Sequence, residues 1–88
     1  MIEKKILSKW FDLVASGKKR WEIRIADFDI NEGDTFLLRE WNPVTKEYTG
    51  RTIEKPVGYV AKFSLEDLYK LNSEEEIKKH GLQIITLE

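Results

Sequence analysis

The sequence predicts an α+β fold, a small mixed β-barrel of about five strands flanked by two or three short helices. Three observations favour it. The chain has 88 residues, of which 41% are hydrophobic. Runs that alternate between apolar and polar residues are separated by turn signals, and the helix signals are short. Because a chain of this length has room for one core, residues 1–88 are expected to form a single domain.

The N-terminal part predicts a strand followed by a short helix. Residues 2–7, "IEKKIL", end in an apolar pair and predict the first strand. Residues 9–16 have apolar side chains at helical spacing, and Ser8 is a suitable residue to cap a helix there. Gly17 stands where a helix commonly ends in a left-handed residue. The helix is therefore expected to be brief.

The next two strands are predicted from alternation with a period of two. Residues 20–25, "RWEIRI", place Trp21, Ile23 and Ile25 on one face, which is expected to be buried. "DFDINEGD" then predicts a turn. In "TFLLREW", residues 35–41, the side chains of positions 36 and 38 oppose those of 37, 39 and 41. Both segments have the pattern of half-buried strands.

The rest of the chain predicts a hairpin, two short helices and a closing strand. Residues 42–50, "NPVTKEYTG", read as a long polar hairpin loop, and residues 51–63 resume β character. Ser64 and Ser73 are each followed three residues later by an acidic residue, which is the signature of a capping box. Residues 82–87, "LQIITL", are expected to form the last strand of the barrel.

Composition excludes several classes of function. The chain has no cysteine and one histidine, so no transition-metal site and no cofactor are expected. No apolar stretch approaches membrane-spanning length, and a cytoplasmic protein without a membrane partner is the expectation. The net charge is −1, which argues against indiscriminate binding to nucleic acid. Residues 1–24 nevertheless carry seven basic and three acidic side chains, a local balance of +4.

The stretch "GKKRWEIR" has the form G-x-K-x-x-E-x-R, with Lys19, Glu22 and Arg24 in the charged positions. Together with "FDLVASGKKRWEIR", "EGDTFLL" and "LREWNPVTKEYTGR", it resembles the ASCH domain of the PUA-like superfamily. The resemblance covers roughly residues 5–60 and extends to a small ASCH-related family of bacteria, archaea and phages. It implies a compact PUA-like barrel whose cleft is partly lined by the signature residues, in a superfamily whose members bind RNA or modified nucleobases.

Some relatives are acetylcytidine amidohydrolases, which are thought to use a Lys, a Thr and a Glu. Lys19 matches the Lys, but Glu22 stands where those enzymes carry Thr. A carboxylate does not perform the nucleophilic chemistry of a hydroxyl. Lys19 and Glu22 are therefore the candidate catalytic residues of an alternative hypothesis, a small hydrolase acting on modified nucleosides or RNA, with Glu22 as general base.

Taken together with this resemblance, the charged residues favour binding of RNA or a nucleotide. Lys19 and Arg24 suit a phosphate, while Glu22 suits an exocyclic base amine. Trp41 ends a strand, where its ring is placed to stack on a base, and Arg39 lies two residues earlier on the same face. Tyr48 lies on the polar loop that is expected to flank the cleft and contact the ligand. Two simpler interpretations remain open, a structural Lys–Glu–Arg cluster and a protein-interaction module.

Overall fold

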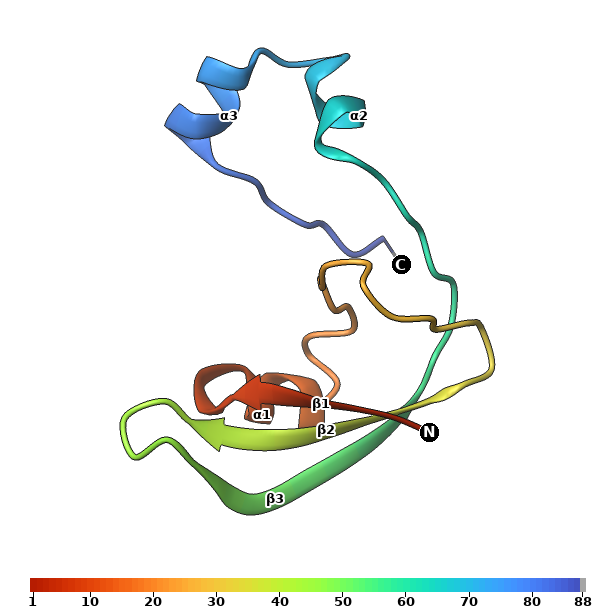
Figure 1. Ribbon diagram of the computed structural model, residues 1–88, viewed down its shortest axis with the longest axis vertical. Coiled ribbons are helices and arrows are strands. Elements are labelled where there is room, and N and C mark those ends of the chain that lie inside the picture. The colour runs from red at the N-terminus through yellow and green to blue at the C-terminus, as the bar shows by residue number, and fades with distance from the viewer. Residues whose placement is uncertain (88) are drawn as a thin grey trace.

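The computed structural model describes residues 1–87, and its centre is a three-stranded sheet (Figure 1). The elements in chain order are β1 (Ile2–Leu7), α1 (Ser8–Ala15), β2 (Thr35–Asn42), β3 (Glu47–Pro56), α2 (Leu65–Tyr69) and α3 (Glu74–His80). The strand order is β1-β2-β3, with β1 parallel and β3 antiparallel to the central β2. The sheet is open and mixed.

The predicted barrel of five strands is therefore wrong. Residues 20–25 have no regular secondary structure and join no ladder, and Ile23 and Ile25 are 52% and 76% exposed. Residues 82–87 also form no strand. Both segments have the composition of strands, but alternation describes only the side-chain faces of a segment and does not supply a neighbouring strand to bond.

The hairpin between β2 and β3 is shorter than predicted. β2 continues to Asn42 and β3 already begins at Glu47, so Tyr48 lies in a strand and not in a loop. The turn is closed by the Asn42 side chain, whose Oδ1 accepts hydrogen bonds from the backbone amides of Val44 and Thr45, and Lys46 adopts φ 57°. β3 ends at Pro56, which has no amide to extend the ladder.

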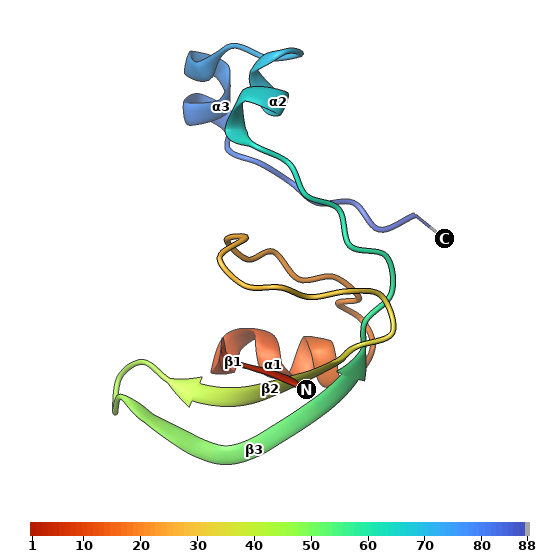
Figure 2. The same ribbon diagram turned by 45° about the vertical axis from the view of Figure 1, so that its right-hand side comes forward.

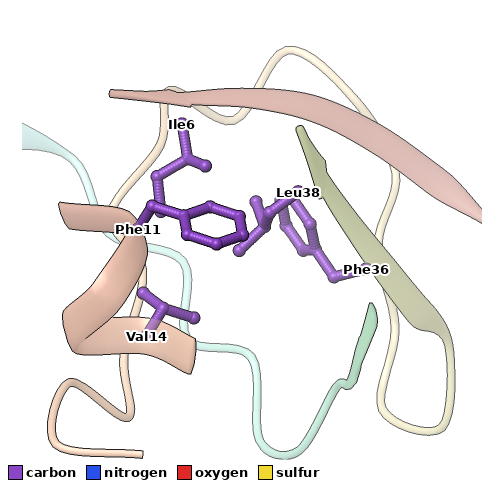
Figure 3. Close-up of a cluster of buried hydrophobic side chains, with 5 residues drawn as sticks. All are labelled: Ile6, Phe11, Val14, Phe36 and Leu38. Carbon is purple, nitrogen blue, oxygen red and sulfur yellow. The ribbon is translucent and has the colours of Figure 1, made fainter. Parts of the chain in front are cut away.

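The core lies between α1 and one face of the sheet (Figure 3). It consists of alternate residues of β1 and β2 and of one stripe of the helix, namely Ile6, Phe11, Val14, Phe36 and Leu38. The period-two prediction for residues 35–41 is confirmed, because Phe36 and Leu38 are buried while Leu37 and Arg39 are not. Part of the connection between α1 and β2 also packs on this core, through Phe28 and Ile30.

The predicted helices are confirmed with small shifts. α1 spans Ser8–Ala15, and Leu7 occupies the cap position expected for Ser8, whose hydroxyl instead donates to the carbonyl of Trp41. Gly17 has φ 82°, the left-handed conformation expected of it. α2 and α3 begin after Ser64 and Ser73, as the sequence predicts. The Ser64 amide donates to the Asp67 carboxylate, and Ser73 Oγ accepts from the Glu76 amide, so each predicted capping box is formed in part. Across residues 1–87, no helix is long and apolar enough to cross a membrane.

Candidate nucleic-acid interface

One face of the sheet carries no helix. α1, α2 and α3 all lie on the other side (Figure 2). The register places Lys5 beside Arg39 and Trp41 beside Tyr48, all on the face opposite the core. These four residues are called the cation–aromatic cluster below. Each comes from a strand, so the sheet backbone fixes their relative positions.

The cation–aromatic cluster is closely packed. The Trp41 and Tyr48 rings meet edge to face, with centroids 5.0 Å apart. Lys5 Nζ lies 3.7 Å from the centre of the Trp41 ring, and the Arg39 guanidinium carbon lies 3.7 Å from the centre of the Tyr48 ring. Such distances are those of cation–π interactions. Arg39 is also oriented by Glu3, whose Oε1 accepts from Nη1 at 3.2 Å.

The cluster is accessible to a ligand. Tyr48 is 40% exposed, and the Arg39 side chain is 37% exposed. An exposed guanidinium offers a planar cation, and aromatic rings offer apolar surfaces of the size of a nucleobase. The arrangement therefore combines stacking surfaces with positive charge at one place.

The signature residues Lys19, Glu22 and Arg24 form a second cluster. Glu22 Oε1 accepts from Lys19 Nζ at 2.8 Å, and its Oε2 accepts from Arg24 Nε at 3.0 Å. Lys19 Nζ also donates to the carbonyl of Trp21 at 3.1 Å and lies over the Trp21 ring. The three side chains are 10%, 22% and 28% exposed, in sequence order. The structure thus brings the three residues together, and they satisfy one another.

A single bond links this signature cluster to the sheet. Arg24 Nη2 donates to the backbone carbonyl of Lys5 at 2.7 Å. Lys5 lies on the edge strand β1, and its side chain belongs to the cation–aromatic cluster. Residues 19–24 are thereby anchored at the outer edge of β1, although residues 20–25 do not pair with β1 as a strand.

The hydrolase hypothesis requires Glu22 to direct a water molecule. In the structure each of its two carboxylate oxygens already accepts a hydrogen bond from a cation. A general base needs an oxygen within hydrogen-bond reach of the proton that it removes. The observed geometry therefore favours a binding or structural role for Glu22.

A third charged group was not predicted from the sequence. Glu40, 4% exposed, follows Phe36 and Leu38 on the core face of β2. Its carboxylate accepts two hydrogen bonds from Arg51, at 2.9 and 2.7 Å, and one from the Thr49 hydroxyl. The bonds from Arg51, and then from Thr49, lower the pKa of Glu40 to about 2. The signal in the sequence was an acidic residue at a position that the alternation assigns to the core.

Arg51 extends this group to the helix. Its Nη1 donates to Asp12 of α1 at 2.9 Å, so one guanidinium ties β2, β3 and α1 together. The carboxylates of Glu40 and Asp12 raise the pKa of Arg51 above its already high value. Because three N–H groups of Arg51 are bonded to carboxylates of the same chain, this group primarily stabilises the fold.

Two open hollows lie away from the predicted site residues. One, of about 380 Å³, is bounded by Ile30, Asn31, Glu32, Tyr59, Val60 and Lys62. The other, of about 170 Å³, lies beside α3. The expected cleft around Lys19, Glu22 and Arg24 coincides with neither. Among residues 1–87 no three His, Cys, Asp or Glu side chains gather in a way that could hold a metal ion.

Sequence comparison places the chain among known proteins. Residues 2–72 match a family described as a domain of unknown function, DUF3850. The chain belongs to the DUF3850 family. A relative in Escherichia phage P2, an uncharacterized 12.9 kDa protein in the GpA 3′ region, is 43% identical over 72 residues. The match covers 80% of this chain and 64% of that protein, so the chain spans less than two thirds of the relative's length. No solved structure matches significantly.

Comparison of prediction and structure divides the candidate residues into two sets. Arg39, Trp41 and Tyr48 do meet, and so do Lys19, Glu22 and Arg24. The hydrogen bond from Arg24 to Lys5 links the two sets. Lys5 was missed because its position beside Arg39 depends on the parallel pairing of β1 with β2, across 34 positions of sequence. No local pattern reports such a pairing.

Proposed function

We propose that this DUF3850 chain is a nucleic-acid-binding module that recognises a nucleotide or a short single-stranded segment, with RNA as the favoured ligand. The observation that carries the proposal is the cation–aromatic cluster on the helix-free face of the sheet. Single-stranded RNA is recognised by stacking its bases on aromatic rings and Arg guanidinium planes, beside cations that meet the phosphates. Lys5, Arg39, Trp41 and Tyr48 supply these groups within one surface.

The stacking role falls to Arg39, Trp41 and Tyr48. A base placed on the outer side of the Arg39 guanidinium extends the stack that Arg39 already makes with Tyr48. Lys5, whose Nζ lies over Trp41, is a point charge on a flexible stem and suits a phosphate oxygen. With these roles, the base and its phosphate both lie on the helix-free face of the sheet.

The signature residues have a supporting role in the proposal. Lys19 and Arg24 give the edge of β1 a net positive charge even when Glu22 is counted, and Lys18 and Arg20 beside them are exposed. A phosphate that follows the base platform would meet this edge. The resemblance of the motif to the ASCH domain, whose relatives bind RNA, supports the same assignment, and we propose that relationship for the motif alone and not for a barrel fold.

The test is binding of short, labelled single-stranded RNA, measured by fluorescence anisotropy at low salt. Replacing Tyr48 by Ala removes one ring and the support of Arg39, so we expect the free energy of binding to weaken by roughly 1–3 kcal/mol, the worth of one stacked base. The matched control is Tyr59→Ala, which removes an 87% exposed ring far from the cluster and should leave the affinity unchanged.

Two results would count against the proposal. One is the absence of saturable binding to single-stranded RNA or DNA of any composition tested. The other is equal affinity of the Tyr48→Ala and Tyr59→Ala proteins, provided that both retain the circular dichroism spectrum of the unaltered chain.

A further inference from the structure

Residues 58–87, called the C-terminal arm, lie apart from the sheet and its core (Figures 1 and 2). None of their side chains is buried, and this includes both α2 and α3. Large apolar side chains are nevertheless frequent there. Those with the greatest exposure are Tyr59 at 87%, Leu71 at 89%, Ile85 at 69% and Leu87 at 90%. An arm of this composition has apolar surface that its own chain leaves in water.

The excess of exposed surface can be quantified. The chain has an accessible surface of 7358 Å² and a mass of 10.4 kDa. A compact monomer of that mass exposes about 5,400 Å², so about 2,000 Å² more surface than expected is open. The radius of gyration is 15.0 Å, against about 12 Å for a compact domain of this length. With this surface area and radius of gyration, the isolated chain resembles a subunit taken out of its assembly.

We propose that the C-terminal arm packs against a second copy of this chain, so that two chains form a symmetric dimer by exchanging their arms. If each chain buries its excess surface of about 2,000 Å² in the interface, the dimer buries about 4,000 Å² in total. This area lies within the range of obligate homodimers, about 2,000–5,000 Å². The interface goes beyond the proposed nucleic-acid function and does not depend on it.

A second copy is favoured because each chain carries both halves of the contact. The arm offers residues 82–87, an extended and β-branched segment without a strand partner. The sheet offers the outer edges of β1 and β3, which pair only with β2. Beside β1 the exposed side chains of Ile23 and Ile25 provide further apolar surface. Donor and acceptor surfaces on one chain are the requirement for a closed two-fold exchange.

The first experiment measures the mass of the full chain in solution by light scattering. We expect twice the 10.4 kDa of one chain. The double variant Ile84→Asp, Ile85→Asp places two charges in the arm and should halve the measured mass while the circular dichroism of the sheet is kept. Val44→Asp, an equally drastic change at an 88% exposed position in the β2–β3 turn, should leave the dimer intact. A wild-type mass of one chain at high micromolar concentration overturns the proposal.

A second measurement uses the unaltered chain and so does not depend on how the variants fold. Hydrogen exchange of the arm amides should slow as the protein concentration rises, because protection comes from the partner. Protection that is the same at all concentrations would mean that the arm folds onto its own chain, and would overturn the proposal. Arm amides that exchange freely at every concentration would overturn it as well.

Discussion

Glu40 sits where the alternation of β2 requires an apolar side chain, between the buried Leu38 and the half-exposed end of the strand. A carboxylate in that position is tolerated because Arg51 and Thr49 provide three hydrogen bonds to it. Removing one partner of such a group leaves the other charge without compensation. The same residue therefore stabilises the fold when it is paired and would destabilise it when unpaired.

The lowered pKa of Glu40 predicts how stability depends on pH. The carboxyl has an ordinary pKa of 4.5 when the chain is unfolded and about 2 when it is folded. Its contribution to stability is therefore complete above pH 4.5 and is lost as the pH falls towards 2. Glu40→Gln should lower Tm at pH 7 by roughly 5 °C or more, and should flatten the fall of Tm between pH 4.5 and 2.

Thermal unfolding followed by circular dichroism at several pH values checks this prediction. Glu54→Gln is the control, because Glu54 is an exposed carboxylate on the same hairpin. If the two variants gave the same Tm at pH 7, the Glu40–Arg51 pair would have no special part in the stability of the sheet.

At the level of elements, β2 holds the structure together. It pairs with both other strands, and its core face contacts α1. Leu38, at its centre, is 1% exposed, and no described side chain is more deeply buried. Loss of its packing affects both strand pairs and the helix at once.

Leu38→Ala should consequently reduce the free energy of unfolding by about 2–5 kcal/mol, the range for truncating a buried leucine. Val44→Ala, in the exposed turn that follows β2, should change it by less than about 0.5 kcal/mol. Urea unfolding of the two variants makes the comparison. A small effect of Leu38→Ala would mean that α1 and the sheet do not share one core.

How far the sequence predicts these elements depends on what determines each one. Helix caps at Ser64 and Ser73 and the left-handed Gly17 are local, and the sequence predicts all three. The faces of β2 are also local, because a period of two follows from strand geometry alone. Strand partners are not local, which is why residues 20–25 and 82–87 were assigned to a barrel that the structure lacks.

The candidate site shows the same division. Trp41 and Tyr48 are seven residues apart and flank a tight turn, close enough in sequence for their meeting to be anticipated. The contribution of Lys5 depends on the parallel ladder. The spacing of the signature residues predicts that they belong together. It does not reveal that the Glu22 carboxylate forms salt bridges with both Lys19 and Arg24.

At the scale of the whole molecule, charge limits how the chain binds nucleic acid. The net charge is −1, and the positive balance of +4 is confined to residues 1–24. Few phosphates can therefore be neutralised by one chain. Under the proposed function, most of the binding free energy comes from stacking and little from the release of counterions.

This distribution predicts a weak dependence of affinity on salt. With two or three phosphate contacts, each contributing about −0.7, the slope of log K against log salt concentration should be no steeper than about −2 for single-stranded RNA. Titrations between low and physiological salt measure the slope. A slope several times steeper would indicate that the protein contacts many phosphates along its surface. That result would contradict a site for one or two nucleotides.

The pairing of β1 with β2 has a consequence for the order in which the chain acquires its structure. The β2–β3 hairpin needs only a four-residue turn to close, whereas Ile2 pairs with Phe36 across the whole of α1 and the connection that follows. Closing the longer loop costs more entropy, so the hairpin forms first and offers β1 its template. On the ribosome, β1 is synthesised well before β2. Its side chains therefore stay exposed to solvent until the β2–β3 hairpin has emerged.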